Sequence, residues 1–380
     1  MRVAVLLEQL LAPVPGGTGR YSRELAAALA RTAAGGDGVT GWTAGHRDLG
    51  AAVSAGISGP RRVPLPRRAL VAAWERGVGP GPRGADVVHA PTVLAPPRRR
   101  PLVVTVHDAV PWTLPRTLTP RGVAFHRRMI ARAVADADAI TVPTAAVRDQ
   151  LAQLAPGFAA RVRAGEVHVQ PPGVTPALRQ PPTPEWSETV RRRYRLPERY
   201  LLSLATLEPR KGLDVLLEAL AADPGLPALL VVGAPGWGNV DVAGQCRRLG
   251  LDENRVRVLG QVSDADLGVL LRDALLLAAP SRGEGFGLPV AEAMSAGTAV
   301  VCSDDAALSE VAGPAARIVA RGDVEAWARA LAATAADDGL RARMAAAGRA
   351  RSAGFDWDRT AEAAWQLYRR LLGRDPGGSR

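Results

Sequence analysis

Two glutamates eight residues apart mark the segment of this chain whose residue types best suit chemistry. Glu284 and Glu292 lie in SRGEGFGLPVAEAMSAG, residues 281–297. Pro289 suits the first turn of a helix, so the pattern predicts a helix over 288–296, with Glu284 in a glycine-flanked loop before it. Both carboxylates could then face one pocket, beside backbone N–H groups that can bind a phosphate or a sugar hydroxyl. The alternative is an ordinary strand-to-helix turn with solvated glutamates.

A pair of cations, Arg210 and Lys211, occupies another expected strand-to-helix turn, in SLATLEPRKGLDVLLEAL. Arginine can grip phosphate oxygens with two N–H groups, and lysine offers a compact point charge. Such a pair suits a diphosphate, above all one that becomes a leaving group. Lys211 is the only lysine among 48 basic residues, which favours a specific role over the alternative, a solvated basic turn.

A glycine-rich segment, PVPGGTGRYSREL, follows the first expected strand and precedes a helix predicted over 21–32. Gly17 and Gly19 fit the start of a dinucleotide-binding fingerprint. The fingerprint is incomplete, because Ser22 stands at the third glycine position and Asp37 lies in a GGDG turn. We therefore expect a glycine loop whose backbone approaches a bound diphosphate, rather than a nicotinamide site. A plain tight turn is the alternative.

Two histidines end neighbouring strands of the first half. His107, in VVTVHDAVP, is expected to donate a hydrogen bond to a sugar hydroxyl or to shape the reaction centre; the alternative is a structural histidine that caps the next loop. His89 could line the same floor. We find no DxD motif and no cluster of His, Asp and Glu at metal-ligand spacing, so we expect no catalytic metal and no cofactor.

These segments need a scaffold that brings strand ends together. Short apolar runs alternate with longer helical segments, the pattern of βα units around a parallel sheet. A proline-rich run over 171–186 is too long for an ordinary βα loop, so we predict two doubly wound domains, 1–177 and 178–355, and an amphipathic terminal helix within 356–373. The predicted strands are 3–7, 39–43, 86–89, 102–106, 139–142 and 167–170 in the first domain, and 200–205, 228–233, 256–259, 275–279, 299–302 and 316–319 in the second.

Length and composition exclude several classes of protein. The 380 residues are 47% hydrophobic and 22% charged, which excludes a disordered or fibrous chain. No uncharged stretch reaches 18 residues, so no membrane-spanning helix is expected. The opening MRVAVLLEQLL is typical of a first strand rather than of a signal peptide. Two distant cysteines exclude a disulfide framework or a zinc site and favour a reducing cytoplasm.

The charge is uneven along the chain. The net charge is +11, yet residues 1–180 carry 23 Lys or Arg against 11 Asp or Glu, while the remainder carries 25 against 26. A basic first half suggests an anionic partner. Among anionic partners, namely nucleic acid, anionic lipid or a phosphorylated substrate, we expect a membrane surface rather than nucleic acid, because arginines gather on a helix predicted over 121–135. GC-rich codon usage is the alternative explanation. The arginines are Arg121, Arg127, Arg128 and Arg132.

Together these segments resemble retaining glycosyltransferases of the GT-B fold, specifically glycosyltransferase family 4. The resemblance covers most of the chain, through GGTGRYS, VHD, ADAITVPTAAVRDQL, VHVQPPGV, LEPRKG, VRVLGQVSDADL, EGFGLPVAEAMSAGTAVV and FDWDRTAEAAWQLYRRLL. It implies an α/β fold of two Rossmann-like domains that face a cleft, with the terminal helix returning to the first domain. It also implies a nucleotide-diphosphate sugar as donor.

Residue by residue, the resemblance implies that Glu284 and His107 lie beside the donor sugar and that Glu292 holds the ribose hydroxyls. Arg210 and Lys211 would hold the diphosphate. Thr206 stands where many members carry an arginine, so the clamp would rely on Arg210 instead. The other donor-binding positions would act largely through their backbone: Gly17 at the diphosphate, Val262 near the base, and Phe286, Gly287 and Leu288 at the sugar and phosphate.

The resulting hypothesis is metal-independent transfer of a hexosyl group, of the mannosyl or rhamnosyl type, from a GDP-mannose-like or other NDP-hexose donor with retention at the anomeric carbon. The expected acceptor is a hydroxyl of a lipid-linked or cell-surface glycan precursor, because the first domain faces the acceptor in this fold. The expected location is the cytoplasm, with peripheral contact at the inner face of the membrane. A nucleotide-sugar epimerase and a phosphorylase are rivals that could share the architecture. A Rossmann oxidoreductase and a basic membrane- or nucleic-acid-binding protein without catalysis are the other two.

Overall fold

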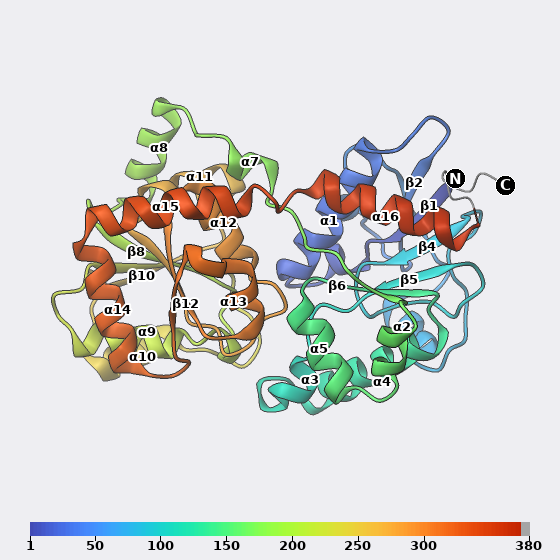
Figure 1. The fold of residues 1–380 in the computed structure, drawn as a ribbon, viewed down its shortest axis with the longest axis horizontal. Helices are drawn as coiled ribbons and strands as arrows, with labels where there is room; N and C mark the ends of the chain where they lie inside the picture. The colour runs from blue at the N-terminus through green and yellow to red at the C-terminus, as the bar shows by residue number, and fades with distance from the viewer. Residues whose placement is uncertain (374–380) are drawn as a thin grey trace. The chain divides into compact units, whose positions relative to one another are not determined.

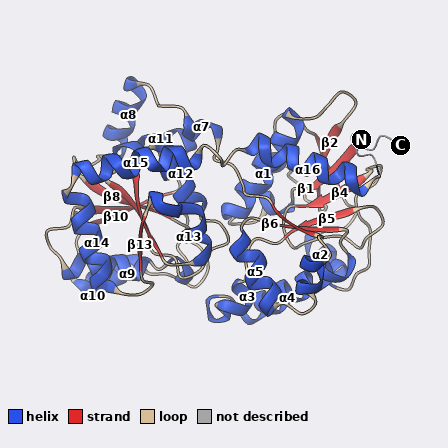
Figure 2. Cartoon of the chain, in the orientation of Figure 1, coloured by secondary structure: helices blue, strands red, loops and turns tan. Residues whose placement is uncertain are grey.

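Two parallel β-sheets organise the chain. The computed structural model describes residues 1–373 and divides into two compact units. Of the described residues, the first unit holds 1–173 and 356–373, and the second holds 174–355. The predicted two Rossmann-like domains are present, and the division between the units lies four residues before the predicted one. Helices and strands alternate along each unit (Figures 1 and 2).

The first sheet orders its strands β3-β2-β1-β4-β5-β6-β7. Alternate residues of a strand face opposite sides of a sheet, and here both sides are apolar. Val3 and Val5 belong to one core, and Ala4 and Leu6 belong to the other. Strands covered on both faces have continuous apolar sequences, which is why most of them are predictable. Their bounds are β1 Arg2–Leu6, β2 Gly38–Thr43, β3 Ser58–Arg62, β4 Val87–Ala90, β5 Leu102–Thr105, β6 Ala139–Val142 and β7 Val167–Val169.

Helices connect these strands, and the terminal helix α16, which follows the second unit in the sequence, packs among the helices of the first unit. Helix α16 packs along α1 within the first unit (Figure 1). The indole N–H of Trp365 donates to the carbonyl of Leu29 over 3.1 Å, and Tyr368 is fully buried. The chain thus returns to the first unit, as predicted. The helices of this unit are α1 Gly16–Arg31, α2 Arg67–Glu75, α3 Val110–Thr113, α4 Pro120–Asp136, α5 Ala145–Leu154, α6 Phe158–Arg163 and α16 Trp357–Leu371, with 3-10 turns η1 Glu8–Leu11, η2 Gly50–Ala52 and η3 Pro115–Thr117.

The second sheet orders its strands β10-β9-β8-β11-β12-β13, again all parallel. Tyr200 and Leu202 face one apolar core, while Leu201 faces the other. The strands are β8 Tyr200–Leu204, β9 Ala228–Val232, β10 Val256–Gly260, β11 Leu276–Ala279, β12 Ala299–Ser303 and β13 Arg317–Val319. The helices are α7 Pro176–Arg179, α8 Pro184–Tyr194, α9 Leu213–Ala222, α10 Val242–Leu249, α11 Asp264–Asp273, α12 Leu288–Ala296, α13 Ala306–Ala312, α14 Val324–Ala336 and α15 Asp338–Ser352, with 3-10 turns η4 Pro209–Lys211 and η5 Gly313–Ala315.

Among the residues described, none of the helices combines the length and the apolar character that crossing a bilayer would require.

Candidate active site

The site predicted in the second unit lies where two neighbouring strands end. Strands β8 and β11 pair in parallel, and the chain order reverses between them, because β9 and β10 lie on one side and β12 and β13 on the other. Ligands of doubly wound sheets bind at such a switch point, beyond the carboxyl ends of the strands. The turn of Lys211 follows β8, and the loop of Glu284 follows β11. The topology therefore brings together two residues that are 73 positions apart in the sequence.

Gly212 lets the cation-bearing turn η4 approach the Glu284 loop. Its φ is +68°, in the left-handed region that favours glycine. A Cβ atom at this position would lie 2.3 Å from the carbonyl oxygen of Pro280, closer than real Cβ contacts come. The glycine in LEPRKG is thus needed both for the backbone conformation and for the close packing of turn against loop.

The helix predicted after Glu284 is present as α12 and begins at Leu288. Gly287 precedes it with a φ of +88°, and a Cβ there would lie 2.2 Å from a methyl carbon of Leu308. Pro289 occupies the first turn, where its missing N–H leaves no hydrogen bond unmade. These local features fix the loop that carries Glu284 against the start of the helix.

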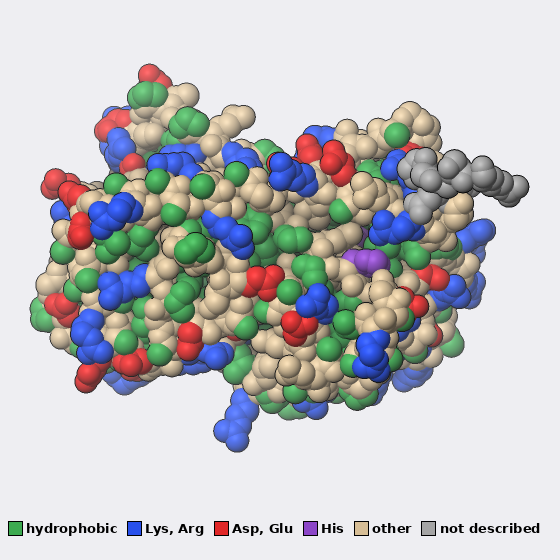
Figure 3. All heavy atoms as spheres, viewed as in Figure 1, with side chains coloured by type: hydrophobic (Ala, Val, Ile, Leu, Met, Phe, Trp, Pro, Cys, Tyr) green, Lys and Arg blue, Asp and Glu red, His purple; other side chains and the backbone are tan. Residues whose placement is uncertain are grey.

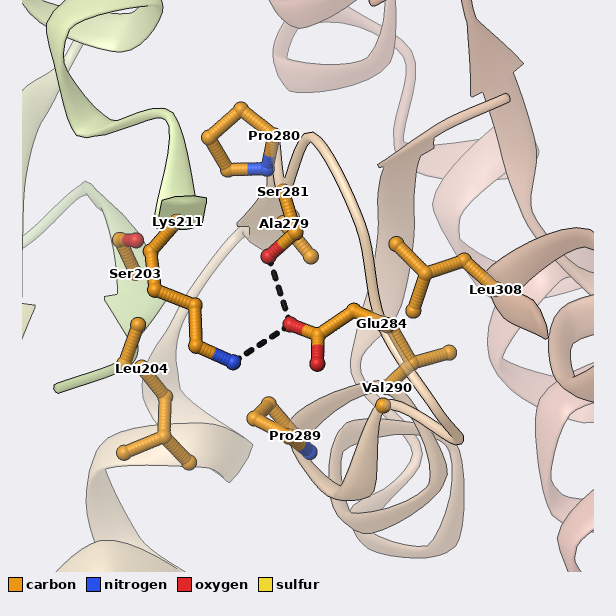
Figure 4. Close-up of a pocket in the computed structure, with 12 residues that line it drawn as sticks. Ser203, Leu204, Lys211, Ala279, Pro280, Ser281, Glu284, Pro289, Val290 and Leu308 are labelled. Carbon is orange, nitrogen blue, oxygen red and sulfur yellow. Dashed lines mark hydrogen bonds and ion pairs between the residues drawn. The ribbon is translucent and has the colours of Figure 1, made fainter. Parts of the chain in front are cut away.

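An ion cluster forms where turn and loop meet, and Figure 4 shows the contacts of Glu284 with Lys211 and Ser281. The Lys211 ammonium lies 2.6 Å from Oε1 of Glu284, and Arg210 Nη1 lies 3.2 Å from Oε2. The Ser281 hydroxyl also donates to Oε1, over 2.7 Å. The side chain of Glu284 is only 11% exposed, so these charge-assisted contacts are screened little by solvent. We call Arg210, Lys211 and Glu284 the ion cluster.

The electrostatics of the ion cluster keep its carboxylate charged. Burial alone would raise the pKa of Glu284, but the positive charges of Lys211 and then Arg210 outweigh it and lower the pKa to about 2. Burial, and next the charge of Arg210, lower the pKa of Lys211, while Glu284 opposes them. The site is therefore a mostly buried cluster of opposite charges. A charged ligand could replace one of these charges as the partner of the other.

Two polar residues that hydrogen-bond to Glu284 were not among the predicted site residues. Ser281 bridges from its hydroxyl to Glu284, and its own carbonyl accepts from Ser303 over 2.5 Å. Asp305 accepts a hydrogen bond from the backbone N–H of Glu284 and caps helix α13 through two further N–H groups. Ser281 opens the predicted segment, and Asp305 follows a strand end, so a search for polar residues at strand ends could have found both.

The other predicted donor-binding residues of the second unit differ in their surroundings. Glu292 is buried in α12, and it is not among the residues that line the small cavity beside Glu284 and Lys211. The structure therefore does not place both glutamates in that one cavity. The side chain of Phe286 is buried, and its ring packs edge-on against Phe355 at 5.2 Å. Leu288 begins α12, and Val262 lies half-buried between β10 and α11.

His107 follows β5 in the first unit. Its Nε2 lies 2.7 Å from the carbonyl oxygen of Pro91, and the ring of Tyr21 meets it edge-on at 4.7 Å. Burial lowers the pKa of His107, although the hydrogen bond to Pro91 and the charge of Asp108 oppose this, and the lowered pKa favours the neutral ring. A carbonyl only accepts, so Nε2 carries the proton and Nδ1 is an acceptor. The geometry thus fits acceptance of a hydrogen bond at Nδ1 instead of the expected donation.

Two further predictions for the first unit need correction. His89 does not line a site floor, because it is fully buried and its ring nitrogens lie 2.5 Å from the Tyr368 hydroxyl and 3.0 Å from that of Thr105. It holds the returning helix α16. Gly17 does not lie in a loop, because α1 already begins at Gly16. Exposed in the first turn of a long helix, Gly17 keeps a backbone position that suits a phosphate.

Comparison with known proteins places the chain in a family. The family model described as Glycosyl transferases group 1 matches residues 187–351, and that of Glycosyltransferase Family 4 matches residues 15–178. The chain is also 30% identical over 290 residues to O-antigen chain mannosyltransferase B of Escherichia coli, which covers 75% of this chain and 74% of that protein. This chain belongs to glycosyltransferase family 4.

Solved structures agree on the fold of this family 4 glycosyltransferase. It is similar to sucrose-phosphate synthase from Thermosynechococcus elongatus, with a TM-score of 0.77, 22% identity and coverage of 98% of this chain and 99% of that one. It is also similar to Anabaena HepE in complex with UDP and glucose, with a TM-score of 0.74, 21% identity and coverage of 97% and 99%. These likenesses show the GT-B fold.

The family decides between the classes of function that the sequence left open. The chain is a glycosyltransferase, not a Rossmann oxidoreductase or a basic binding protein without catalysis. The ion cluster lies within the span of the group 1 match. Within residues 1–373, the His, Cys, Asp and Glu side chains form no group of three or more that could hold a metal ion.

Proposed function

We propose that this glycosyltransferase transfers mannose from GDP-mannose to an acceptor hydroxyl, with retention of configuration and without a metal ion. The observation that carries the proposal is the ion cluster of Arg210, Lys211 and Glu284, which sets two cations at the switch point of the second sheet. The mannosyl choice draws on the E. coli relative, and the UDP bound to HepE supports a nucleoside diphosphate as leaving group.

Charge exchange within the ion cluster would prepare the reaction. Lys211 and Arg210 neutralise Glu284 in the structure, and an incoming diphosphate would compete with Glu284 for both cations. As the bond from the sugar to the phosphate breaks, negative charge grows on the leaving oxygen and positive charge grows on the anomeric carbon. Lys211 and Arg210 would stabilise the first charge, and the partly released Glu284 would face the second.

Retention follows from attack on the same face of the sugar that the diphosphate leaves. The bond from the anomeric carbon to the phosphate oxygen breaks, the bond to the acceptor oxygen forms, and the acceptor proton passes to the leaving phosphate. Glu284 is the carboxylate that lines the cavity, and its ion pairs with Lys211 and Arg210 reduce its strength as a nucleophile. We therefore propose front-face attack without a covalent intermediate.

A hollow in the first unit supports a lipid-linked acceptor. It has a volume of about 500 Å³ and lies beside η3 and the start of α4. Most of its lining is apolar, and the segment 109–135 that contains it has five arginines and no Asp or Glu. A hydrophobic hollow with cations at its rim suits the chain of an anionic lipid. Its lining residues are Pro115, Arg116, Leu118, Pro120, Val123, Ala124 and Arg127.

Internal ion pairs neutralise part of the positive charge on α4. Arg121 forms a bidentate pair with the buried Glu75 at 2.8 and 2.5 Å and lowers the pKa of that carboxyl. Arg128 lies 3.8 Å from the same carboxylate, and Arg132 pairs with Asp136. Figure 3 likewise shows basic side chains scattered over this face of the protein rather than gathered in one patch. We therefore propose that membrane contact, at the inner face of the cytoplasmic membrane, relies on the hollow more than on the helix charge.

Thermal shifts with a panel of GDP-, UDP-, ADP- and dTDP-sugars test the donor. A cognate donor at 100-fold its Kd should add about 2.7 kcal/mol to the free energy of unfolding. GDP-mannose should give the largest shift, and proton NMR of the product should show the anomeric configuration of the donor. Chelation of metal ions should leave the rate unchanged. Absence of a new glycoside after acceptor is added would instead indicate an epimerase or a phosphorylase.

Vesicle sedimentation tests the acceptor side. Vesicles with anionic phospholipids should bind the enzyme, and binding should weaken as salt rises. Arg116→Glu should reduce binding several-fold, while Arg329→Glu, at a 67% exposed arginine of the second unit, should not. No binding, binding that ignores salt, or equal effects of the two variants would contradict the proposed membrane contact.

A further inference from the structure

Arg282 joins the turn that carries the cations to the loop that carries Glu284. Its backbone N–H donates to the carbonyl of Arg210 over 2.8 Å. Its guanidinium Nη1 donates to the carbonyl of Pro209 over 2.9 Å. Arg282 precedes Glu284 by two residues, so two consecutive carbonyls of η4 are held by the same loop that presents the carboxylate.

The guanidinium of Arg282 is itself anchored to helix α9. It forms a bidentate pair with Asp214, with Nη1 2.8 Å from Oδ1 and Nη2 2.6 Å from Oδ2. The hydrogen bond to Asp214 also raises the pKa of Arg282. A bidentate pair fixes the orientation of the planar guanidinium as well as its position. A single side chain thus links the Glu284 loop, the cation turn and the first turn of the next helix.

Arg282 stands outside the cavity that it shapes. Neither Arg282 nor Asp214 is among the residues that line the cavity beside Glu284. Their side chains are 33% and 41% exposed, well above the 15% of Lys211. A ligand in the cavity would therefore contact Lys211, and Arg282 would act on that ligand only through the turn.

We propose that Arg282 is a positioning residue that sets where Arg210 and Lys211 stand relative to Glu284. The turn η4 spans three residues and ends at Lys211, with Gly212 as its cap, so it has little internal hydrogen bonding to hold its own shape. Misplacement of a charged group by about 1 Å can cost a factor of about 100 in rate. The part of this inference that concerns a diphosphate rests on the proposed function.

The only lysine of the chain gives a readout that needs no substrate. Protein labelled with 15N and 13C in lysine shows one side-chain NMR signal, that of Lys211. In Arg282→Met and in the milder Asp214→Asn, the signal should shift and its titration should move toward that of an exposed lysine, because the unheld turn admits water. Arg191→Met is the matched control, since it breaks a bidentate pair with Asp273, at 2.7 and 3.0 Å, in the same unit.

Each outcome of the NMR experiment is decisive. Circular dichroism first confirms that the variants are folded, and Asp214→Asn serves if Arg282→Met is not. A Lys211 signal and titration unchanged in the folded variants would overturn the positioning role. A change of the same size in Arg191→Met would also overturn it, because the effect would then follow from any lost ion pair in this unit.

A double-mutant cycle extends the test to ligand binding, with the Kd of GDP measured by calorimetry. Lys211→Ala should weaken GDP binding at least tenfold in the wild-type background but less than threefold in Arg282→Met. A misplaced lysine contributes little to GDP binding, so its removal then costs little affinity. Additive losses would contradict the positioning role. If the wild type binds neither GDP nor UDP, the proposed function fails, while the lysine signal still decides the role of Arg282.

Discussion

Gly212 and Gly250 share one backbone conformation, with φ at 68° and ψ at 23°, but differ in what surrounds them. A Cβ atom on Gly212 would lie 2.3 Å from the carbonyl oxygen of Pro280, whereas a Cβ on Gly250 would meet no atom within 4 Å. Substitution of Gly250 would therefore cost only the strain of a left-handed backbone, whereas substitution of Gly212 would add a steric clash to the same strain. At Gly212 that packing brings the cation turn against the Glu284 loop.

Alanine at these two positions should give different losses of stability. Gly250→Ala should cost about 1 kcal/mol, the strain of an L-residue in the left-handed region. Gly212→Ala should cost that plus roughly 1–3 kcal/mol for the clash with Pro280, and it should also slow donor turnover. Urea unfolding of both variants measures the free energies, and equal losses would show that the approach of turn to loop is not tight in solution.

Lys211→Ala should lower kcat/KM by a factor on the order of 100 to 1,000 while the protein stays folded, because it removes a cation from the leaving diphosphate. Steady-state transfer kinetics measure the loss. Arg192→Ala is the control, since Arg192 is 74% exposed and pairs within its own helix α8. Near-normal turnover in Lys211→Ala would remove this lysine from the proposed mechanism.

The strands with apolar, buried sequences were predicted from the sequence, whereas the polar strand β3 was missed. The apolar runs that form strands such as β5 and β12 were found because they are covered on both faces. Strand β3, Ser58–Arg62, was missed because its sequence SGPRR is polar, contains a proline and is largely exposed at the sheet edge. The start of α1 was placed five residues late, because two adjacent glycines favour a loop in isolation.

The site was predictable where chemistry is local and not where it depends on contacts across the fold. Glu284 and Lys211 stand out by residue type and by their turns, and the structure pairs them. The contact of Arg282 with Asp214 joins residues 68 positions apart. In a chain with 47 arginines, no spacing in the sequence predicts which arginine pairs with Asp214. The tautomer of His107 was likewise hidden, since it depends on a carbonyl 16 residues away.

Substitutions at His107 can separate its two ring nitrogens. The amide oxygen of His107→Asn takes the place of Nδ1, the expected acceptor, while the amide of His107→Gln reaches toward Nε2 and the carbonyl of Pro91. If Nδ1 accepts from the donor sugar, the Asn variant should keep more donor turnover than the Gln variant, by about tenfold. Rates of both variants, measured with saturating acceptor, decide this. Better activity in the Gln variant would indicate a purely structural histidine.

The ion cluster should leave a signature in the acid stability of the enzyme. The pKa of Glu284 is lowered in the folded state from its ordinary 4.5 to about 2. Its ionised form therefore stabilises the fold fully above the unfolded pKa of about 4.5, and this contribution is lost as the pH falls through about 2. A shift of this size corresponds to roughly 3 kcal/mol.

Urea unfolding of wild type and Glu284→Gln at several pH values between 6 and 3 measures that contribution. The difference in unfolding free energy between the two should be largest at pH 6 and should shrink steadily below pH 4.5, because only the wild type has a carboxylate to protonate. Glu325→Gln, at an 84% exposed glutamate, should show almost no difference at any pH. Parallel curves for wild type and Glu284→Gln would mean that Lys211 and Arg210 do not hold the carboxylate in solution.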